Sequence, residues 1–85
     1  YAILLMMVAQ FCNMIPGELL HVIADAHIYD RHVDVVKELI GRETYPAPKV
    51  SLNPEVKDFY AFTTADLIVE DYQAGPQVKN IPIAV

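Results

Sequence analysis

The spacing of apolar and polar positions separates a first helix from the rest of the chain. Residues 1–9 are apolar without interruption, and Gln10 is the first polar residue after them. Pro16 and Gly17 then interrupt regular structure, because proline lacks a backbone donor and glycine is conformationally free. The pattern predicts a helix over residues 1–13 that is buried on nearly all sides. The apolar run is too short to span a membrane, which takes roughly 20 residues.

A two-residue alternation occupies residues 18–29. All even positions from 20 to 28 are apolar, and the odd positions include His21, Asp25, His27 and Tyr29. Side chains alternate across the pleat of a strand, so this pattern predicts a strand with one buried face and one face that can line a pocket. A helix is the alternative, because several of the same polar residues are also spaced four apart. The β-branched residues of the segment favour the strand.

Shorter elements complete the predicted layout. Residues 30–40 are predicted to form a second helix, which an aspartate can cap at its start and Gly41 can end. Two short strands are predicted over residues 49–52 and 67–72, with a loop containing about one helical turn between them. Residues 73–85 are predicted to form an irregular tail. A chain of 85 residues forms at most one small domain.

Composition narrows the classes of function. The net charge is -5, and the six basic residues are scattered, which argues against a nucleic-acid-binding surface. Cys12 is the only cysteine, so an internal disulfide is impossible, and a reducing, cytosolic setting is the simpler expectation. Apolar residues make up 54% of the chain. We therefore expect some apolar surface to meet another chain or another part of a larger protein.

The candidate chemistry is binding rather than catalysis. On a strand, His21 and His27 would lie roughly 20 Å apart, too far for one metal ion, so no metal is expected. Cys12 is expected to be a small buried side chain, and His21 and Asp25 are expected to be structural. His27 and Tyr29, two residues apart, would point the same way and could grip one oxygen between an imidazole and a phenol. The alternative is that both are core residues whose polar tips bond to the backbone.

Several short blocks occur in an order that resembles the C-terminal part of thymidylate synthase. The resemblance runs nearly end to end and is carried by Tyr1-Ala2, Ala9-Gln10, Pro16-Gly17-Glu18, His21, Asp25-Ala26-His27-Ile28-Tyr29, His32, Arg42-Glu43, Pro46, Pro48-Lys49 and Ala84-Val85. It implies that residues 1–85 are the C-terminal segment of a thymidylate synthase domain whose N-terminal part lies upstream. It also implies an α/β (α+β) fold, with helices packed on a mixed β-sheet.

The resemblance implies an enzyme that reductively methylates dUMP to dTMP with 5,10-methylenetetrahydrofolate, as a cytoplasmic homodimer. Carried over residue by residue, His27 and Tyr29 would hold the 3′-hydroxyl of the deoxyribose. Ala84 and Val85 would belong to a tail that folds over the folate. The nucleophilic cysteine of the family stands in a Pro-Cys-His setting, which Cys12 does not match. No catalytic residue is therefore assigned, and the segment alone is expected to be inactive.

Two alternatives stay open. Deoxycytidylate hydroxymethylase shares the scaffold, and the residue that reads the base would lie upstream of Tyr1. A truncated, non-catalytic subunit or remnant would keep the fold without the chemistry. An upstream Pro-Cys-His in the same reading frame would argue against this second alternative. The resemblance is also weaker in the tail, where Gln73-Ala74-Gly75-Pro76 departs from the family pattern.

Overall fold

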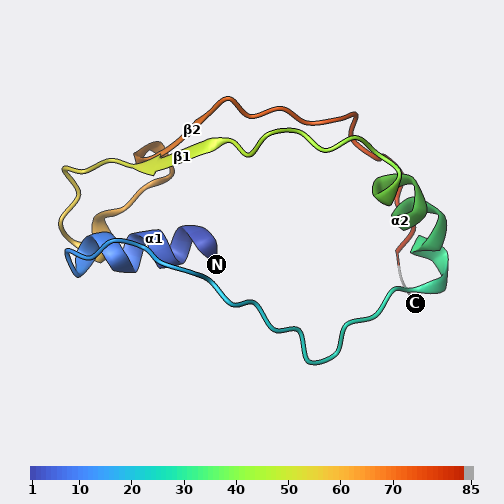
Figure 1. Ribbon diagram of the computed structural model, residues 1–85, viewed down its shortest axis with the longest axis horizontal. Helices are drawn as coiled ribbons and strands as arrows, with labels where there is room; N and C mark the ends of the chain where they lie inside the picture. Colours follow the sequence, from blue (N-terminus) through green and yellow to red (C-terminus); the bar gives the residue numbers. More distant parts are fainter. Residues whose placement is uncertain (84–85) are drawn as a thin grey trace. The chain divides into compact units, whose positions relative to one another are not determined.

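A computed structural model describes residues 1–83 of the chain (Figure 1). The chain divides into two compact units. The first unit comprises Tyr1–His21 and Ala47–Tyr72, and the second comprises Val22–Pro46 and the tail from Gln73 onward. Helices occur in both units and a small sheet in the first, which confirms the α+β class. Among the described residues, no helix is long and apolar enough to cross a membrane.

The first unit contains helix α1, Ala2–Phe11, and two antiparallel strands, β1 (Lys49–Leu52) and β2 (Leu67–Glu70). The predicted strand over residues 49–52 is thus confirmed, and the second ends two residues earlier than predicted. It ends there because Asp71 adopts a positive φ of 57°, which leaves the extended region. Figure 1 shows the two strands running side by side.

Helix α1 ends through its own backbone, before the proline that the sequence pattern had indicated. Asn13 takes the left-handed conformation with φ of 54°, and its N–H donates to the carbonyl of Gln10 at 3.1 Å. The N–H of Met14 donates to the carbonyl of Ala9 at 2.7 Å. This pair of bonds is a Schellman motif, and asparagine is one of the few residues that accept the conformation it needs.

The prediction that the first helix is buried on nearly all sides was wrong. Of the described residues, Ala9 alone is buried, and large side chains of α1 such as Phe11 are about half exposed. The contacts of α1 are few: the ring of Phe11 lies edge-on to Phe59 at 6.3 Å between centroids. The amide Nε2 of Gln10 donates to the carbonyls of Asn53 and Val56, at 2.8 and 3.0 Å. One short hairpin and its turns cannot cover a ten-residue apolar helix.

The predicted strand over residues 18–29 was also wrong. Within residues 1–83 this stretch has no strand, and only a turn at residues 24–25 interrupts its irregular backbone. Its even-numbered apolar side chains are exposed, with Leu20 at 88%. A strand needs a partner for its backbone N–H and C=O groups, and β1 and β2 pair with each other. The alternation is typical of a strand, but it carries no information on whether a neighbouring strand is present.

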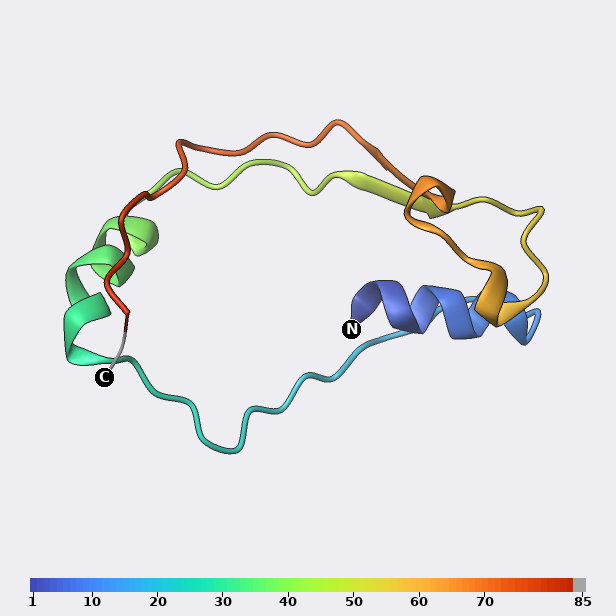
Figure 2. The ribbon, with the colours of Figure 1, turned by 180° about the vertical axis from the view of Figure 1, so that it is seen from behind.

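The second unit is built around the predicted helix over residues 30–40. Its first turn, Asp30–His32, is a 3-10 turn, and α2 continues over Val33–Ile40. Gly41 ends the helix as predicted, but with a right-handed φ of -78°, so the conformational freedom of glycine is not used. Figure 2 shows the C-terminal tail passing beside this helical segment.

Asp66 holds together the turn that precedes β2. Its carboxylate accepts the N–H of Thr63 at 2.7 Å, the amide of Asn53 at 3.0 Å and the hydroxyl of Thr63 at 2.9 Å. The backbone N–H of Thr63 contributes most, and together these donors hold the pKa of Asp66 below its ordinary value. The charged form is favoured because all three groups donate to it.

We expect this carboxylate to make stability pH-dependent in acid. Because its folded-state pKa is lowered, its contribution is present above the unfolded pKa of about 3.9 and is lost as pH falls through the folded value. Asp66→Asn should therefore lower Tm at neutral pH, and the gap from the wild type should narrow as pH falls below about 4. The Tm gap is measured by thermal unfolding of the full-length protein from neutral pH to below about pH 4. Asp34→Asn, at an exposed position of α2, is the control. A gap that is independent of pH would contradict the assignment.

Candidate functional site

The structure brings together the two side chains that the sequence predicted as a binding pair. The rings of His27 and Tyr29 lie edge to face, with centroids 5.1 Å apart and planes at 89°. Both are accessible, with the His27 side chain 53% exposed and Tyr29 50% exposed. Tyr29 has an extended backbone, with φ of -70° and ψ of 145°. The pair forms in irregular backbone, without the strand that the sequence pattern predicted.

Backbone contacts set the orientation of the His27 ring. Its Nδ1 lies 3.0 Å from the carbonyl oxygen of Asp25. A carbonyl can only accept, so Nδ1 carries the proton and Nε2 of the neutral ring is left as an acceptor. The Asp25 carboxylate lies 3.6 Å from the same nitrogen, but its side chain is 95% exposed, so solvent screens the pair. His27 thus offers an acceptor, and Tyr29 offers a hydroxyl that can donate or accept.

The site extends from Tyr29 to the C-terminal tail through His32, which no pattern in the sequence singled out as a site residue. The rings of Tyr29 and His32 lie edge to face, with centroids 5.8 Å apart. The Nε2 of His32 lies 2.6 Å from the carbonyl oxygen of Pro82, and Arg31 donates to the carbonyl of Ile83 at 3.4 Å. The only sequence signal for His32 was its place among the blocks of the family resemblance.

A second contact holds the start of the tail. Arg42 donates to the carbonyl of Pro76 at 2.7 Å, and its other terminal nitrogen pairs with Glu38 at 2.6 Å, one helical turn earlier. The Glu38–Arg42 pair has the i, i+4 spacing that suits a helix, and it fixes the guanidinium toward the tail. The described tail is therefore held near both of its ends, by Arg31 and His32 in the first turn of the helical segment and by Arg42 just after its end.

The other predicted residues lie elsewhere. His21 belongs to the first unit, where its ring lies 6.3 Å from that of Tyr1. Cys12 is exposed, which corrects the expectation of a buried side chain. It is the C-cap residue of α1 and therefore lies at the end of the helix. Ala84 and Val85 lie outside the described residues. Within residues 1–83, no group of three or more His, Cys, Asp or Glu side chains is arranged to hold a metal ion.

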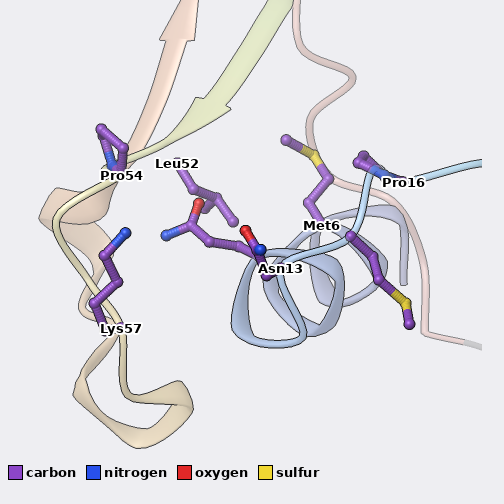
Figure 3. A pocket seen from close by; sticks show the side chains of 8 residues that line it. Met6, Asn13, Pro16, Leu52, Pro54 and Lys57 are labelled. Carbon is purple, nitrogen blue, oxygen red and sulfur yellow. The ribbon is translucent and has the colours of Figure 1, made fainter.

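The first unit has an open cavity of about 280 Å³ between α1 and the turn after β1 (Figure 3). The amide of Gln10 is engaged with the carbonyls of Asn53 and Val56, so it is not free for a ligand. Lys57 is the one charged side chain in the lining, which offers no converging set of polar groups. The lining residues are Met6, Gln10, Asn13, Met14, Pro16, Leu52, Pro54 and Lys57.

Comparison with known proteins shows the family of the chain. The family model described as thymidylate synthase matches residues 1–85. The chain is 43% identical over 72 residues to a bifunctional dihydrofolate reductase-thymidylate synthase from Plasmodium chabaudi, and the match covers 85% of the chain and 12% of that protein. It also matches the structure of thermostable thymidylate synthase A from Bacillus subtilis, with 40% identity and a TM-score of 0.89. That match covers 98% of the chain and 30% of that structure.

The chain thus spans less than a third of the length of either relative. The match to the family nevertheless extends over all of its residues, including the His27–Tyr29 pair and the segments that hold the tail. The chain belongs to the thymidylate synthase family.

Proposed function

We propose that residues 1–85 are the C-terminal segment of a thymidylate synthase domain. In this proposal the full-length protein reductively methylates dUMP to dTMP, and 5,10-methylenetetrahydrofolate supplies both the carbon and the hydride. Family membership supports the reaction class, and the 30% coverage of the solved relative supports a segment of a longer enzyme. The observation that carries the proposal is the accessible edge-to-face pair of His27 and Tyr29.

The role we assign to this pair is to hold the 3′-hydroxyl of the deoxyribose. A sugar hydroxyl can donate to the free Nε2 of His27 and accept from the hydroxyl of Tyr29. Two directional contacts to one oxygen fix the sugar better than either contact alone, because each removes a different freedom of rotation. The segment itself carries out no covalent chemistry in this proposal, because Cys12 does not stand in the setting of the family's nucleophile.

The role we assign to Ala84 and Val85 is closure of the tail over bound folate. Pro82 and Ile83, directly before them, are held by His32 and Arg31 beside Tyr29. Closure would exclude water and place the folate against the nucleotide, which favours the reactive geometry. No metal takes part in this proposal, and folate enters as a co-substrate.

We further propose a cytoplasmic homodimer. The exposed apolar side chains of both units, such as Phe11 in the first and Val22 in the second, need cover from the rest of the domain or from a second copy. The net charge of -5 and the scattered basic residues favour a protein without a nucleic-acid partner. A lone cysteine suits a reducing compartment.

Two experiments on the natural protein test this function. Mass spectrometry of the protein from its source should give several times 9.5 kDa, and a mass near 9.5 kDa would favour the truncated, non-catalytic alternative. The full-length protein, incubated with dUMP and methylenetetrahydrofolate, should form dTMP and dihydrofolate in equal amounts. A parallel reaction with dCMP distinguishes the hydroxymethylase alternative. Turnover of dCMP alone, or of neither nucleotide, would refute the proposed reaction.

A further inference from the structure

Three side chains, two in the first turn of the helical segment and one just after its end, hold the tail through its backbone carbonyls. His32 contacts the carbonyl of Pro82, Arg31 that of Ile83 and Arg42 that of Pro76. Contacts of this kind do not depend on the side chains of the tail, so they fix its path whatever its sequence. Proline has no N–H, so its carbonyl is the one backbone group through which it can be held by a hydrogen bond.

His32 makes the closest of these contacts, and it is also the one that reaches the binding pair. Its Nε2 lies 2.6 Å from the Pro82 carbonyl oxygen, whereas the Arg31 contact is 3.4 Å, near the limit for a hydrogen bond. The His32 ring also lies edge to face with that of Tyr29, at 85° between planes. Edge-to-face packing restrains both rings, because sliding either one loses the favourable alignment of their charge distributions.

We propose that His32 is a positioning residue that joins the nucleotide-contacting Tyr29 to the C-terminal tail. Tyr29 sets the orientation of the His32 ring, and His32 donates its Nε2–H to Pro82 and so holds the end of the tail in place for closure. A nucleotide that restrains Tyr29 thereby also restrains the tail. The functional half of this inference rests on the proposed function, whereas the structural half, that His32 tethers the tail, does not.

Two replacements of His32 separate its donor from its ring. His32→Gln keeps an N–H donor at a similar distance from the backbone and loses the ring, whereas His32→Phe keeps an aromatic ring and loses the donor. The tether depends on the donor, so we expect His32→Phe to release the tail and His32→Gln to retain much of it. His21→Phe, a histidine of the first unit, is the matched control.

Limited proteolysis measures how firmly the tail is held, and it does not depend on the activity of the protein as an enzyme. Lys79 is exposed and lies in the tail three residues before Pro82, so trypsin can cut after it and release the end of the chain. In the full-length protein, His32→Phe should speed this cut about five- to tenfold, the effect of losing one hydrogen bond to a backbone carbonyl. His32→Gln and His21→Phe should stay within about twofold of the wild type. Equal cleavage of His32→Phe and the wild type would overturn the inference.

Steady-state kinetics then tests the link to the reaction. His32→Phe should raise KM for methylenetetrahydrofolate about five- to tenfold and leave Kd for dUMP within about twofold, and His32→Gln should restore most of the loss. Equal impairment of both variants would mean that His32 is merely structural. If the wild type forms no dTMP, the proposed function fails, and the proteolysis result still decides whether His32 tethers the tail.

Discussion

Removing Val85 from the full-length protein is expected to lower kcat on the order of 10²-fold while Kd for dUMP stays within about twofold. The tail path is held through Pro76, Pro82 and Ile83, so the last residues follow directly from an anchored segment. In the proposed closure, the free α-carboxylate of Val85 completes the cover over folate. Loss of one residue moves that carboxylate by one peptide unit, about 3.8 Å, which is far more than a closed reactive geometry tolerates.

The measurement is kcat at saturating folate together with equilibrium binding of dUMP. Val85→Ala is the matched control, because it keeps the chain length and the carboxylate but removes two methyl groups. It should retain most of the turnover. Wild-type turnover without Val85 would contradict the proposed role of the tail, and a parallel loss of dUMP binding would show that the truncation damages the fold instead.

Local patterns predicted the elements that depend on local interactions. The helix over residues 30–40 and the strand over residues 49–52 formed where their spacing placed them, and Gly41 ends the helix as predicted, although Asp30 lies inside the first turn and the N-cap makes no side-chain bond. The end of α1 at Phe11 was misplaced because Pro16-Gly17 is the stronger interruption in the sequence, although Asn13 is the residue that ends the helix. Asparagine just after an apolar helix is a readable signal for a left-handed C-terminal cap.

Elements that need a distant partner could not be predicted in this way. The alternation over residues 18–29 is typical of a strand, but strand formation depends on a neighbouring strand, which no local pattern reports. The burial expected for α1 failed for the same reason, since only Ala9 of the described residues finds enough cover. In both cases the pattern marks apolar side chains that are exposed here and that would be buried only if another part of a protein covered them.

The candidate site also combines a contact between residues close in sequence, which could be predicted, with contacts between distant residues, which could not. His27 and Tyr29 are two residues apart and were expected on one side of a strand; their rings lie together although this part of the described chain forms no strand. The contact of His32 with Pro82 joins residues 50 positions apart, and that of Arg42 with Pro76 joins residues 34 apart. Neither has a periodic signal, because each depends on the path that the chain takes between the two residues.

Replacing both His27 and Tyr29 is expected to raise Kd for dUMP roughly fifteenfold, which is more than either single replacement but less than the product of the two. Each side chain is assigned one hydrogen bond to the sugar hydroxyl, and a hydrogen bond of this kind contributes about 0.5–1.5 kcal/mol. Tyr29→Phe, which removes only the hydroxyl, should therefore raise Kd roughly threefold to tenfold, and so should His27→Ala. Turnover of bound dUMP should fall less than its affinity does, because the 3′-hydroxyl is remote from the carbon that is methylated.

The matched control is Tyr60→Phe, which removes the same hydroxyl from an exposed tyrosine of the first unit and should leave Kd unchanged. A large fall in kcat at saturating dUMP, with unchanged Kd, would contradict the binding role of the pair. The double variant adds a further distinction. If both residues hold the same oxygen, either single loss frees the hydroxyl to rotate, so the second replacement costs less than the first and the two effects combine to less than their product. If the effects multiply in full, the two side chains contact different atoms of the ligand.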